Sequence, residues 1–132
     1  LCDGNFKEDS GVVDAPIARS KKDRKKMAVV EGGRRAVTHY TVVKRYGKYT
    51  LVRFELETGR THQIRVHASS IHHPIVGDTV YGGSVALYNT GQLLHAAELI
   101  LTHPHTGERM NFTCELPKYF SAVLDKLDKT SQ

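Results

Sequence analysis

Two alternating runs of residues between Ala36 and Glu57 constrain the fold of this chain most strongly. In the second run, apolar or β-branched side chains occupy every other position, and from Arg53 onward charged side chains lie between them. One face carries Thr50, Val52, Phe54 and Leu56, and the other carries Arg53, Glu55 and Glu57. This period of two is typical of half-buried strands. Because Gly47 and Lys48 separate the runs, the sequence predicts a long antiparallel hairpin with a tight turn.

The remaining elements are read from their periodicity. A helix is expected over residues 61–71, because Ile64, Ala68 and Ile71 recur at helical spacing and form its buried stripe. The other expected elements are strands over residues 99–102 and 110–116, a turn at 106–108 between them, and an amphipathic closing helix over residues 118–132. The predicted class is α+β, with a mixed, mainly antiparallel sheet and packed helices. We see no second-domain boundary, so residues 1–132 are expected to belong to one domain.

Composition limits the function classes. The chain has 132 residues, of which 39% are hydrophobic, so it can build a core. Its formal charge of +5 and pI of about 9.3 favour a polyanionic partner, although a basic domain that binds no nucleic acid would have the same charge. Cys2 and Cys114 are too few for a disulfide scaffold or a cysteine-based zinc site, and we expect Cys114 to be a reduced, buried thiol. No apolar run reaches membrane-spanning length.

The junction between the second strand and the helix carries an unusual density of hydrogen-bonding groups. Residues 56–67 read Leu-Glu-Thr-Gly-Arg-Thr-His-Gln-Ile-Arg-Val-His. A helix N-terminus offers unpaired N–H groups and a partial positive charge, and guanidinium groups fit phosphate or carboxylate. A solvated basic helix face would show the same charges. The order of the string favours a site for an anionic partner.

The same string resembles the third conserved motif of the RluA-type (ribosomal large-subunit) pseudouridine synthases, which isomerise uridine in ribosomal or transfer RNA. Other family blocks follow in order over most of the chain, from about residue 1 to residue 119. They lie at residues 14–17, 27–29, 36–40, 73–78, 81–83, 94–97 and 103–108. The resemblance implies the pseudouridine synthase fold, a structured RNA partner, a cytoplasmic location, no membrane, and neither a metal nor an organic cofactor.

The family's nucleophilic aspartate lies in a His-Arg-Leu-Asp motif, and no such string occurs in this chain. A family tyrosine that stacks on the target base would fall a few positions before Leu1. We therefore expect the chain to be the C-terminal part of one pseudouridine synthase catalytic domain, and to be inactive by itself. The alternative function is a non-catalytic RNA-binding module, and a third is a structural or protein-interaction domain. The sequence upstream of Leu1 in the native protein separates the first two.

The resemblance assigns two residues to the reacting centre. Arg65 would pair with the missing aspartate and orient it, because a nearby guanidinium keeps a nucleophilic carboxylate ionised. An exposed helix arginine is the ordinary alternative for this residue. Ile64 would border the pocket for the base, although a plain core contact explains it almost as well.

Further residues are predicted to contact RNA. Arg60 and Thr61 lie where phosphate contact is easy, and an N-cap role for Thr61 is equally expected. His62 and Gln63 would touch RNA or, somewhat more in keeping with their type, form internal hydrogen bonds. A basic loop over residues 18–26 offers sequence-independent phosphate contacts, with a solvated charged loop as its close alternative. The residues predicted to make these contacts are Lys21, Lys22, Arg24, Lys25 and Lys26.

Two further features are read as structural. His62 and His67 are five residues apart, not the four that places two ligands on one helix face, so no metal site is predicted. Asp78 has no carboxylate near it in the sequence, and Gly77, Gly82 and Gly83 mark tight turns around it. We therefore expect Asp78 to cap a turn rather than to act in catalysis.

Overall fold

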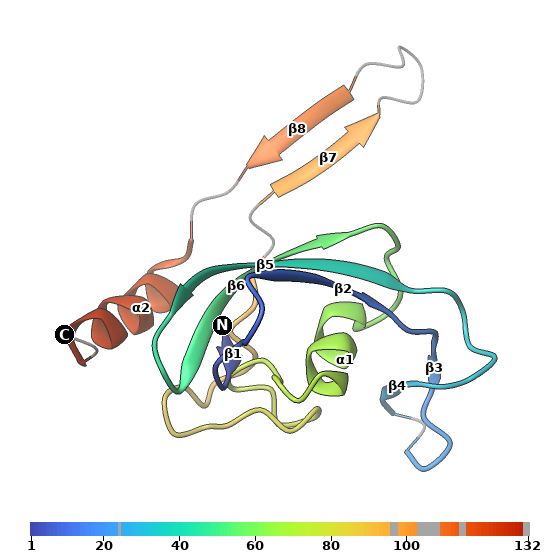
Figure 1. The fold of residues 1–132 in the computed structure, drawn as a ribbon, viewed down its shortest axis with the longest axis horizontal. Helices are drawn as coiled ribbons and strands as arrows, with labels where there is room; N and C mark the ends of the chain where they lie inside the picture. Colours follow the sequence, from blue (N-terminus) through green and yellow to red (C-terminus); the bar gives the residue numbers. More distant parts are fainter. Residues whose placement is uncertain (24, 96–97, 103–108, 114–115, 131–132) are drawn as a thin grey trace. The chain divides into compact units, whose positions relative to one another are not determined.

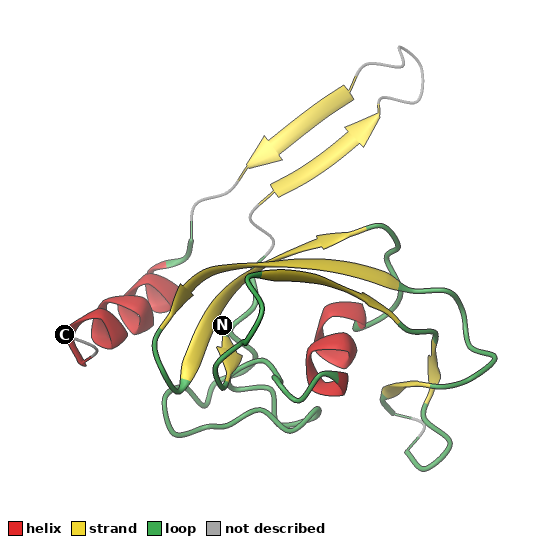
Figure 2. Cartoon of the chain, in the orientation of Figure 1, coloured by secondary structure: helices red, strands yellow, loops and turns green. Residues whose placement is uncertain are grey.

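The computed structural model describes residues 1–23, 25–95, 98–102, 109–113 and 116–130 (Figure 1). The chain divides into two compact units, Leu1–Leu93 and Leu94–Thr130. Helices and antiparallel strand pairs are both present, which confirms the predicted α+β class (Figure 2). That residues 1–132 form a single domain remains a prediction.

The first unit is built on a four-stranded antiparallel sheet with the strand order β1-β6-β5-β2. These strands are β1 (Cys2–Asp3), β2 (Ser10–Asp14), β5 (Val37–Arg45) and β6 (Tyr49–Leu56). Strands β5 and β6 form the predicted hairpin, with Gly47 in the turn at a φ of 85°, a conformation that suits glycine. A register shift between Val42 and Lys44 interrupts the pairing. The prediction of the longest strand pair is therefore confirmed.

The apolar face of β6 is less buried than its sequence pattern predicts. Thr50 is fully buried and Arg53 and Glu55 are exposed, as the alternation predicts. Leu56, however, keeps 49% of its surface exposed at the end of the strand. Only the first part of β6 therefore builds the core, and the chain leaves the sheet at Leu56 towards the helix.

A short hairpin precedes β5 and was not predicted. Strands β3 (Ile17–Arg19) and β4 (Met27–Val29) pair antiparallel, with Ala18 opposite Ala28 and Arg19 opposite Met27. The predicted basic loop over residues 18–26 is therefore wrong at its start, because its first two residues belong to a strand. Strands of three residues contain too little alternation to be read from a sequence.

Helix α1 (Gln63–Ser70) packs against the sheet and against β4, and it is shorter than the predicted span of 61–71 (Figure 1). His62 occupies the N-cap position with a φ of 54° and makes no side-chain capping bond, so the alternative role of Thr61 as N-cap is wrong. The buried residues of α1 are Gln63, Val66, His67 and Ala68. Ile64 and Ile71 are only half-buried, so the predicted apolar stripe is wrong except at Ala68.

Buried hydrogen bonds explain why two polar residues of α1 face the interior. Gln63 Nε2 donates to Thr38 Oγ1 at 2.9 Å, and Thr38 Oγ1 lies 2.7 Å from His67 Nδ1. His67 Nε2 donates to the carbonyl oxygen of Ala15 at 2.9 Å. The buried side chains of Gln63 and His67 are thus hydrogen-bonded, so the helix keeps its place without a continuous apolar stripe.

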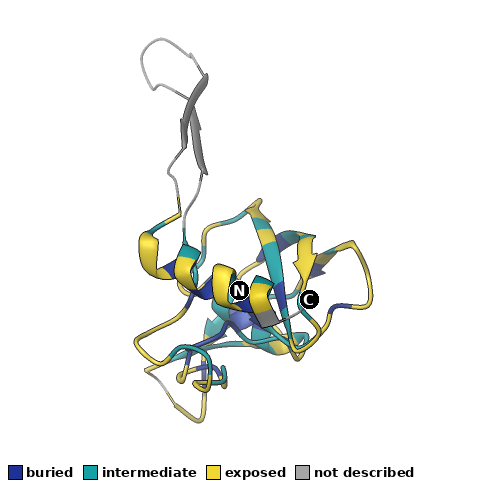
Figure 3. Ribbon diagram, turned by 90° about the vertical axis from the view of Figure 1, so that its left-hand side faces the viewer, coloured by how far each residue is buried: buried dark blue, intermediate teal, exposed yellow. Residues whose placement is uncertain are grey.

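The second unit contains the hairpin of β7 (Glu98–Thr102) and β8 (Arg109–Thr113) and the helix α2 (Lys118–Thr130). The predicted strand over 99–102 is confirmed. Of the strand expected over 110–116, residues 110–113 lie in β8, whereas residues 114–115, which include Cys114, and the turn at 106–108 lie outside the described residues. Along α2, Phe120, Val123 and Leu127 are buried at helical spacing, so the helix has one buried and one exposed face as predicted (Figure 3). In the described residues, no helix has the length and apolar character needed to cross a membrane.

Candidate functional site

One face of α1 contacts the turn that follows it in the chain. His62, Arg65 and Ser69 are spaced three and four residues apart, which places them on the same side of a helix. Their partners are Tyr81 for His62, Asp78 for Arg65 and Tyr81 for Ser69. The sequence therefore brings the arginine predicted for the reacting centre against the 78–81 turn.

Arg65 and Asp78 form a bidentate ion pair. Arg65 Nε donates to Asp78 Oδ2 at 2.8 Å, and Nη2 donates to Oδ1 at 2.9 Å. The Asp78 side chain is 1% exposed and that of Arg65 is 14% exposed. The hydrogen bonds to Asp78 raise the pKa of Arg65 above its ordinary value, although burial acts in the opposite direction. Arg65 is therefore a permanently charged, fixed group that still reaches the surface.

Close backbone packing fixes Asp78 in this position. Gly77 has a φ of 83°, and a Cβ atom there would lie 2.0 Å from the carbonyl oxygen of Gly91. A Cβ atom on Gly83 would lie 1.9 Å from the carbonyl oxygen of Ile75. The Asp78 N–H donates to Ile75 O at 3.0 Å, and Asp78 O accepts from the Gly83 N–H at 2.7 Å. The predicted turn at Asp78 is thus present, but the prediction that the Asp78 side chain caps it is wrong, because both carboxylate oxygens accept hydrogen bonds from Arg65 instead.

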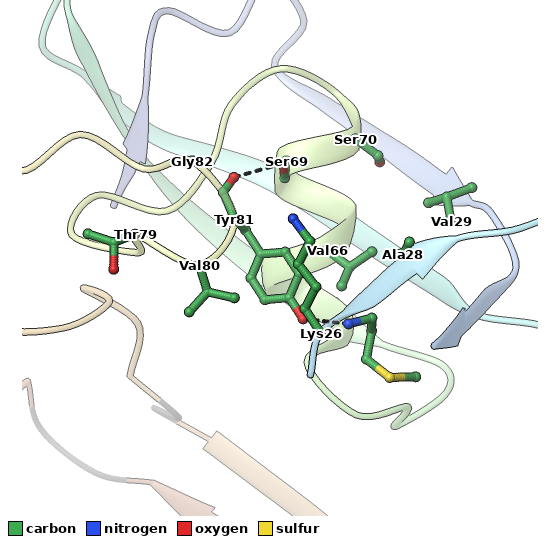
Figure 4. Close-up of a pocket in the computed structure, with 11 residues that line it drawn as sticks. Lys26, Ala28, Val29, Val66, Ser69, Ser70, Thr79, Val80, Tyr81 and Gly82 are labelled. Carbon is green, nitrogen blue, oxygen red and sulfur yellow. Dashed lines mark hydrogen bonds between the residues drawn. The ribbon is translucent and has the colours of Figure 1, made fainter. Parts of the chain in front are cut away.

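Tyr81 joins the helix, the turn and the β3–β4 hairpin. Its ring lies 5.0 Å from the centre of the Arg65 guanidinium, and its hydroxyl lies 2.8 Å from His62 Nδ1. The same hydroxyl accepts the Met27 N–H at 3.0 Å, and the Tyr81 carbonyl accepts the Ser69 hydroxyl at 2.9 Å (Figure 4). Tyr81 is 8% exposed and packs in the core cluster with Ile17, Ala36 and Val66. The buried ring therefore makes a cation–π contact with the Arg65 guanidinium and holds it in place.

His62 lies near two positively charged side chains, those of Arg65 and Arg19. Burial lowers the pKa of His62, and the positive charges of Arg65 and Arg19 lower it further, while Asp78 acts in the opposite direction. The neutral ring is consequently favoured, with Nδ1 against the Tyr81 hydroxyl. With a neutral imidazole at His62, the positive charge near it comes from Arg65 and Arg19.

Gln63 forms internal hydrogen bonds, which is one of the two roles that the sequence predicts for it. The Gln63 side chain is 3% exposed, and its Nε2 donates to Val37 O at 2.9 Å as well as to Thr38. Its Oε1 accepts from Thr58 Oγ1 at 2.6 Å and from the Arg60 N–H at 3.0 Å. Because both ends of the amide are engaged, Gln63 ties the start of α1 to β5. Contact of Gln63 with RNA remains a prediction to which these bonds lend no support.

The other residues of the junction lie nearer the surface. Arg60 Nε donates to Arg35 O at 2.9 Å, which fixes its side chain near the start of β5, and Thr61 is exposed. Ile64 is half-buried beside Arg65, in agreement with either role weighed for it. Among the residues that the structure describes, no three His, Cys, Asp or Glu side chains are grouped so as to hold a metal ion.

The tip of the β3–β4 hairpin displays the predicted basic residues. Lys21, Lys22 and Lys25 are exposed, and Lys26 is half-buried, whereas Arg24 lies outside the described residues. The Ser20 hydroxyl accepts the N–H groups of Lys22 and Asp23, and Asp23 Oδ1 accepts that of Lys25 at 3.0 Å. These local bonds give the tip a defined turn that directs its lysines outward.

An open pocket of about 500 Å³ lies between this hairpin and the 79–82 turn (Figure 4). Lys26, Met27 and Val29 line it from β4 and its approach, Ser69 and Ser70 from α1, and Tyr81 from the turn. The pocket is thus lined by Tyr81, the residue whose ring contacts the Arg65 guanidinium. Sequence reasoning assigned no role to Tyr81 and missed the ion-pairing role of Asp78, although the two residues lie in the blocks at 73–78 and 81–83 that resemble the family and glycines mark the turn around them.

Comparison with known proteins places this geometry in a family. The model of the family described as RNA pseudouridylate synthase matches residues 1–70. An uncharacterized RNA pseudouridine synthase of Bacillus subtilis is 46% identical over 126 residues, which cover 96% of this chain and 42% of the relative. The ribosomal large subunit pseudouridine synthase D of Pseudomonas aeruginosa is 48% identical over 130 residues, which cover 89% of this chain and 41% of the relative. The chain thus spans about two fifths of the length of these relatives.

Solved structures with a similar fold come from proteins of the same description. The human RNA pseudouridylate synthase domain containing 4 has a TM-score of 0.75 and 30% identity, covering 96% of this chain and 59% of that chain. The human RNA pseudouridylate synthase domain containing 1, at 24% identity, shares the fold with a TM-score of 0.75, covering 98% of this chain and 62% of that chain. By sequence motif, family match and fold, the chain belongs to the RNA pseudouridylate synthase family.

Proposed function

We propose that the protein containing this chain isomerises uridine to pseudouridine in structured RNA, ribosomal or transfer, in the cytoplasm. The observation that carries the proposal is the fixed Arg65 guanidinium at the surface of α1, within the motif that resembles the family's third block. The nucleophilic aspartate would come from a segment outside residues 1–132, and this chain by itself would be inactive. The reaction breaks the bond between N1 of the base and the sugar and forms one between C5 and the sugar, while C5 loses its proton and N1 takes one up.

The geometry of Arg65 supports a role beside that aspartate. Asp78 engages Nε and Nη2, and within the described residues Nη1 has no acceptor. A second carboxylate that approached Nη1 would be held ionised by the guanidinium, as a nucleophile requires. Ile64, half-buried next to Arg65, would present an apolar surface to the base.

The charge distribution supports an RNA partner. Exposed Lys21, Lys22 and Lys25 project from a hairpin that packs on the helix carrying Arg65, and Arg60 and Thr61 lie at the start of that helix. Lysines on a defined turn suit phosphate contacts that carry no sequence information. The Pseudomonas relative acts, by its name, on the ribosomal large subunit, which favours ribosomal RNA over transfer RNA.

The proposal is tested with two proteins, the complete native chain and residues 1–132. Each is incubated with ribosomal RNA carrying a tritium label at C5 of uridine, and tritium release is measured. We expect turnover by the complete chain only, together with RNA binding by both proteins. Binding without turnover by the complete chain would favour the alternative, a non-catalytic RNA-binding module, and turnover by residues 1–132 would refute the assignment of the nucleophile to a missing segment.

A further inference from the structure

We propose that the free edge of β4 binds an adenine base of the substrate RNA, in the pocket between the β3–β4 hairpin and the 79–82 turn (Figure 4); this inference rests on the function proposed above. In the described part of the chain, β4 pairs with β3 alone, so one of its edges is left unpaired. Two hydrogen bonds join the base to this edge, one accepted by Met27 O and one donated by the Val29 N–H.

The backbone groups of β4 alternate between its two edges. Lys26 O and the Val30 N–H form backbone bonds across the hairpin, towards β3. In an antiparallel pair, the N–H and C=O groups of Met27 and Val29 therefore point the other way. The Met27 N–H shows where this edge faces, because it donates to the Tyr81 hydroxyl at 3.0 Å and Tyr81 lines the pocket.

Three backbone groups on this edge are available to a ligand, namely Met27 O, the Val29 N–H and Val29 O. No described residue forms a hydrogen bond with any of the three. Along the edge they follow one another as acceptor, donor and acceptor. A ligand that fits must therefore present a donor followed by an acceptor, and no acceptor in the third place.

Adenine is the RNA base whose Watson–Crick edge has this order. Its 6-amino group donates to Met27 O, its N1 accepts from the Val29 N–H, and its C2–H, a weak donor, faces Val29 O. Cytosine in the same pose would place its O2 against Val29 O, so that two acceptors would meet. Guanine and uracil would extend a polar group beyond Met27 O, where the Tyr81 hydroxyl already accepts the Met27 N–H.

The side chains around the edge suit a nucleotide. Val29 and Val80 keep 42% and 48% of their surface exposed, although both line the same pocket, and they lie on opposite sides of the Tyr81 ring (Figure 4). Apolar walls of this kind cover the faces of a planar base. The Thr79 hydroxyl and the Lys26 ammonium group, also on the pocket lining, suit ribose and phosphate.

An RNA base fits this edge better than a peptide strand, which is the other ligand that an unpaired strand edge binds. A peptide ladder continues over several residues, whereas β4 directs only two residues outward and the N–H of one of them is already bonded to Tyr81. The exposed lysines at the tip of the same hairpin also favour a polyanion.

The experiment uses the complete native protein labelled with ¹⁵N and follows the Val29 amide by NMR during titration with AMP, CMP, GMP and UMP. We expect AMP to shift the Val29 amide and to bind there about tenfold more tightly than the other three. Purine riboside monophosphate, which lacks the 6-amino group, should bind about tenfold more weakly than AMP. The Ala28 amide points to β3 and is the internal control.

A pair of variants isolates the backbone donor. Val29→Pro removes the N–H without removing a bond of the hairpin, because this N–H points away from β3, and proline is tolerated at strand edges. Val29→Ala keeps the N–H and removes the apolar wall. We expect Val29→Pro to bind AMP no more tightly than CMP, and Val29→Ala to bind all four nucleotides more weakly while keeping the preference for AMP.

Equal affinities for AMP and purine riboside monophosphate would overturn the inference, and this comparison on wild-type protein decides the matter if Val29→Pro fails to fold. An undiminished preference for AMP in a folded Val29→Pro would also overturn it. A Val29 shift caused by an acidic peptide of alternating glutamate and valine, but by no nucleotide, would assign the edge to a protein partner instead.

Turnover separates this inference from the proposed function. A complete protein that isomerises uridine in ribosomal RNA but shows no AMP-specific shift at Val29 would refute the adenine site alone. AMP-specific binding at Val29 by a protein without turnover on ribosomal or transfer RNA would support the adenine site and refute the proposed function.

Discussion

The hydroxyl of Thr38 on β5 lies 2.7 Å from Nδ1 of His67 on α1, and both side chains are fully buried. Because His67 Nε2 donates to Ala15 O, Nδ1 of the neutral ring is the acceptor of the Thr38 hydroxyl. The same Thr38 oxygen accepts from Gln63 Nε2. A single hydroxyl therefore connects the sheet to two turns of the helix that carries Arg65.

Thr38→Val should lower the free energy of unfolding by about 1–3 kcal/mol, because it leaves His67 Nδ1 buried without a partner. Urea unfolding measures the change, with an unchanged m-value as the sign that the native state stays compact. Thr41→Val on the same strand is the control, since Thr41 is exposed. Equal losses for the two variants would show that the buried hydroxyl adds nothing to stability.

Tyr81→Phe should loosen the β3–β4 hairpin. The substitution removes the hydroxyl that accepts the Met27 N–H at 3.0 Å but keeps the ring below Arg65. Loss of one such bond, about 1 kcal/mol, should speed hydrogen exchange of the Met27 amide by roughly five- to tenfold. The Ile17 amide donates to Arg34 instead and serves as the internal control. Unchanged exchange at Met27 would contradict the role of the hydroxyl.

Replacing Lys21, Lys22 and Lys25 with Glu should weaken binding to all RNA sequences alike. The three side chains are exposed on the hairpin tip, and the slope of log K against log salt should become shallower by about 0.7–0.9 for every phosphate that the variant no longer neutralises. Filter binding at several salt concentrations measures both quantities. A triple reversal at the exposed Lys7, Lys44 and Lys48 changes the net charge equally and is the matched control. Equal losses of affinity for the two triple variants would show that RNA binding depends on the net charge of the protein and not on the position of these lysines in the hairpin.

His62 should make stability depend on pH on the acid side. Its pKa in the folded chain is lowered from the ordinary value of 6.5, so the unfolded chain takes up the proton first as pH falls. Its contribution is fully present above 6.5 and is lost as pH falls through the lowered pKa of the folded state. His62→Gln should therefore show a smaller acid-side decrease in the free energy of unfolding than wild type. Parallel curves for the two proteins would argue against this shift.

The sequence could predict the elements that have a clear period. The β5–β6 hairpin follows from strict alternation around Gly47, and α2 follows from Phe120, Val123 and Leu127 at helical spacing. In α1 the same reasoning chose Ile64 and Ile71 as buried, because an apolar pattern cannot reveal that His67 and Gln63 are hydrogen-bonded inside the core.

The candidate site could be predicted only in part. Arg65 was found because it lies within a recognisable motif. From sequence alone, Asp78 reads as a turn residue, since it lies thirteen positions after Arg65 in a glycine-rich turn and no local pattern connects the two. Tyr81 was missed for the same reason, because its contacts with Met27 and His62 are made by tertiary packing alone.

Arg65→Lys in the complete protein should retain a small fraction of the activity and keep the fold. A lysine supplies the positive charge as a point, so it can pair with Asp78 or with the nucleophilic aspartate but cannot reproduce the planar fork that engages both. Single-turnover kinetics should therefore show a rate between those of wild type and Arg65→Ala. Thermal unfolding should show a smaller loss of stability for Arg65→Lys than for Arg65→Ala, because removal of the charge leaves the Asp78 carboxylate buried and unpaired. A wild-type rate for Arg65→Lys would mean that charge alone suffices at this position, and the argument from the fixed guanidinium plane would fail.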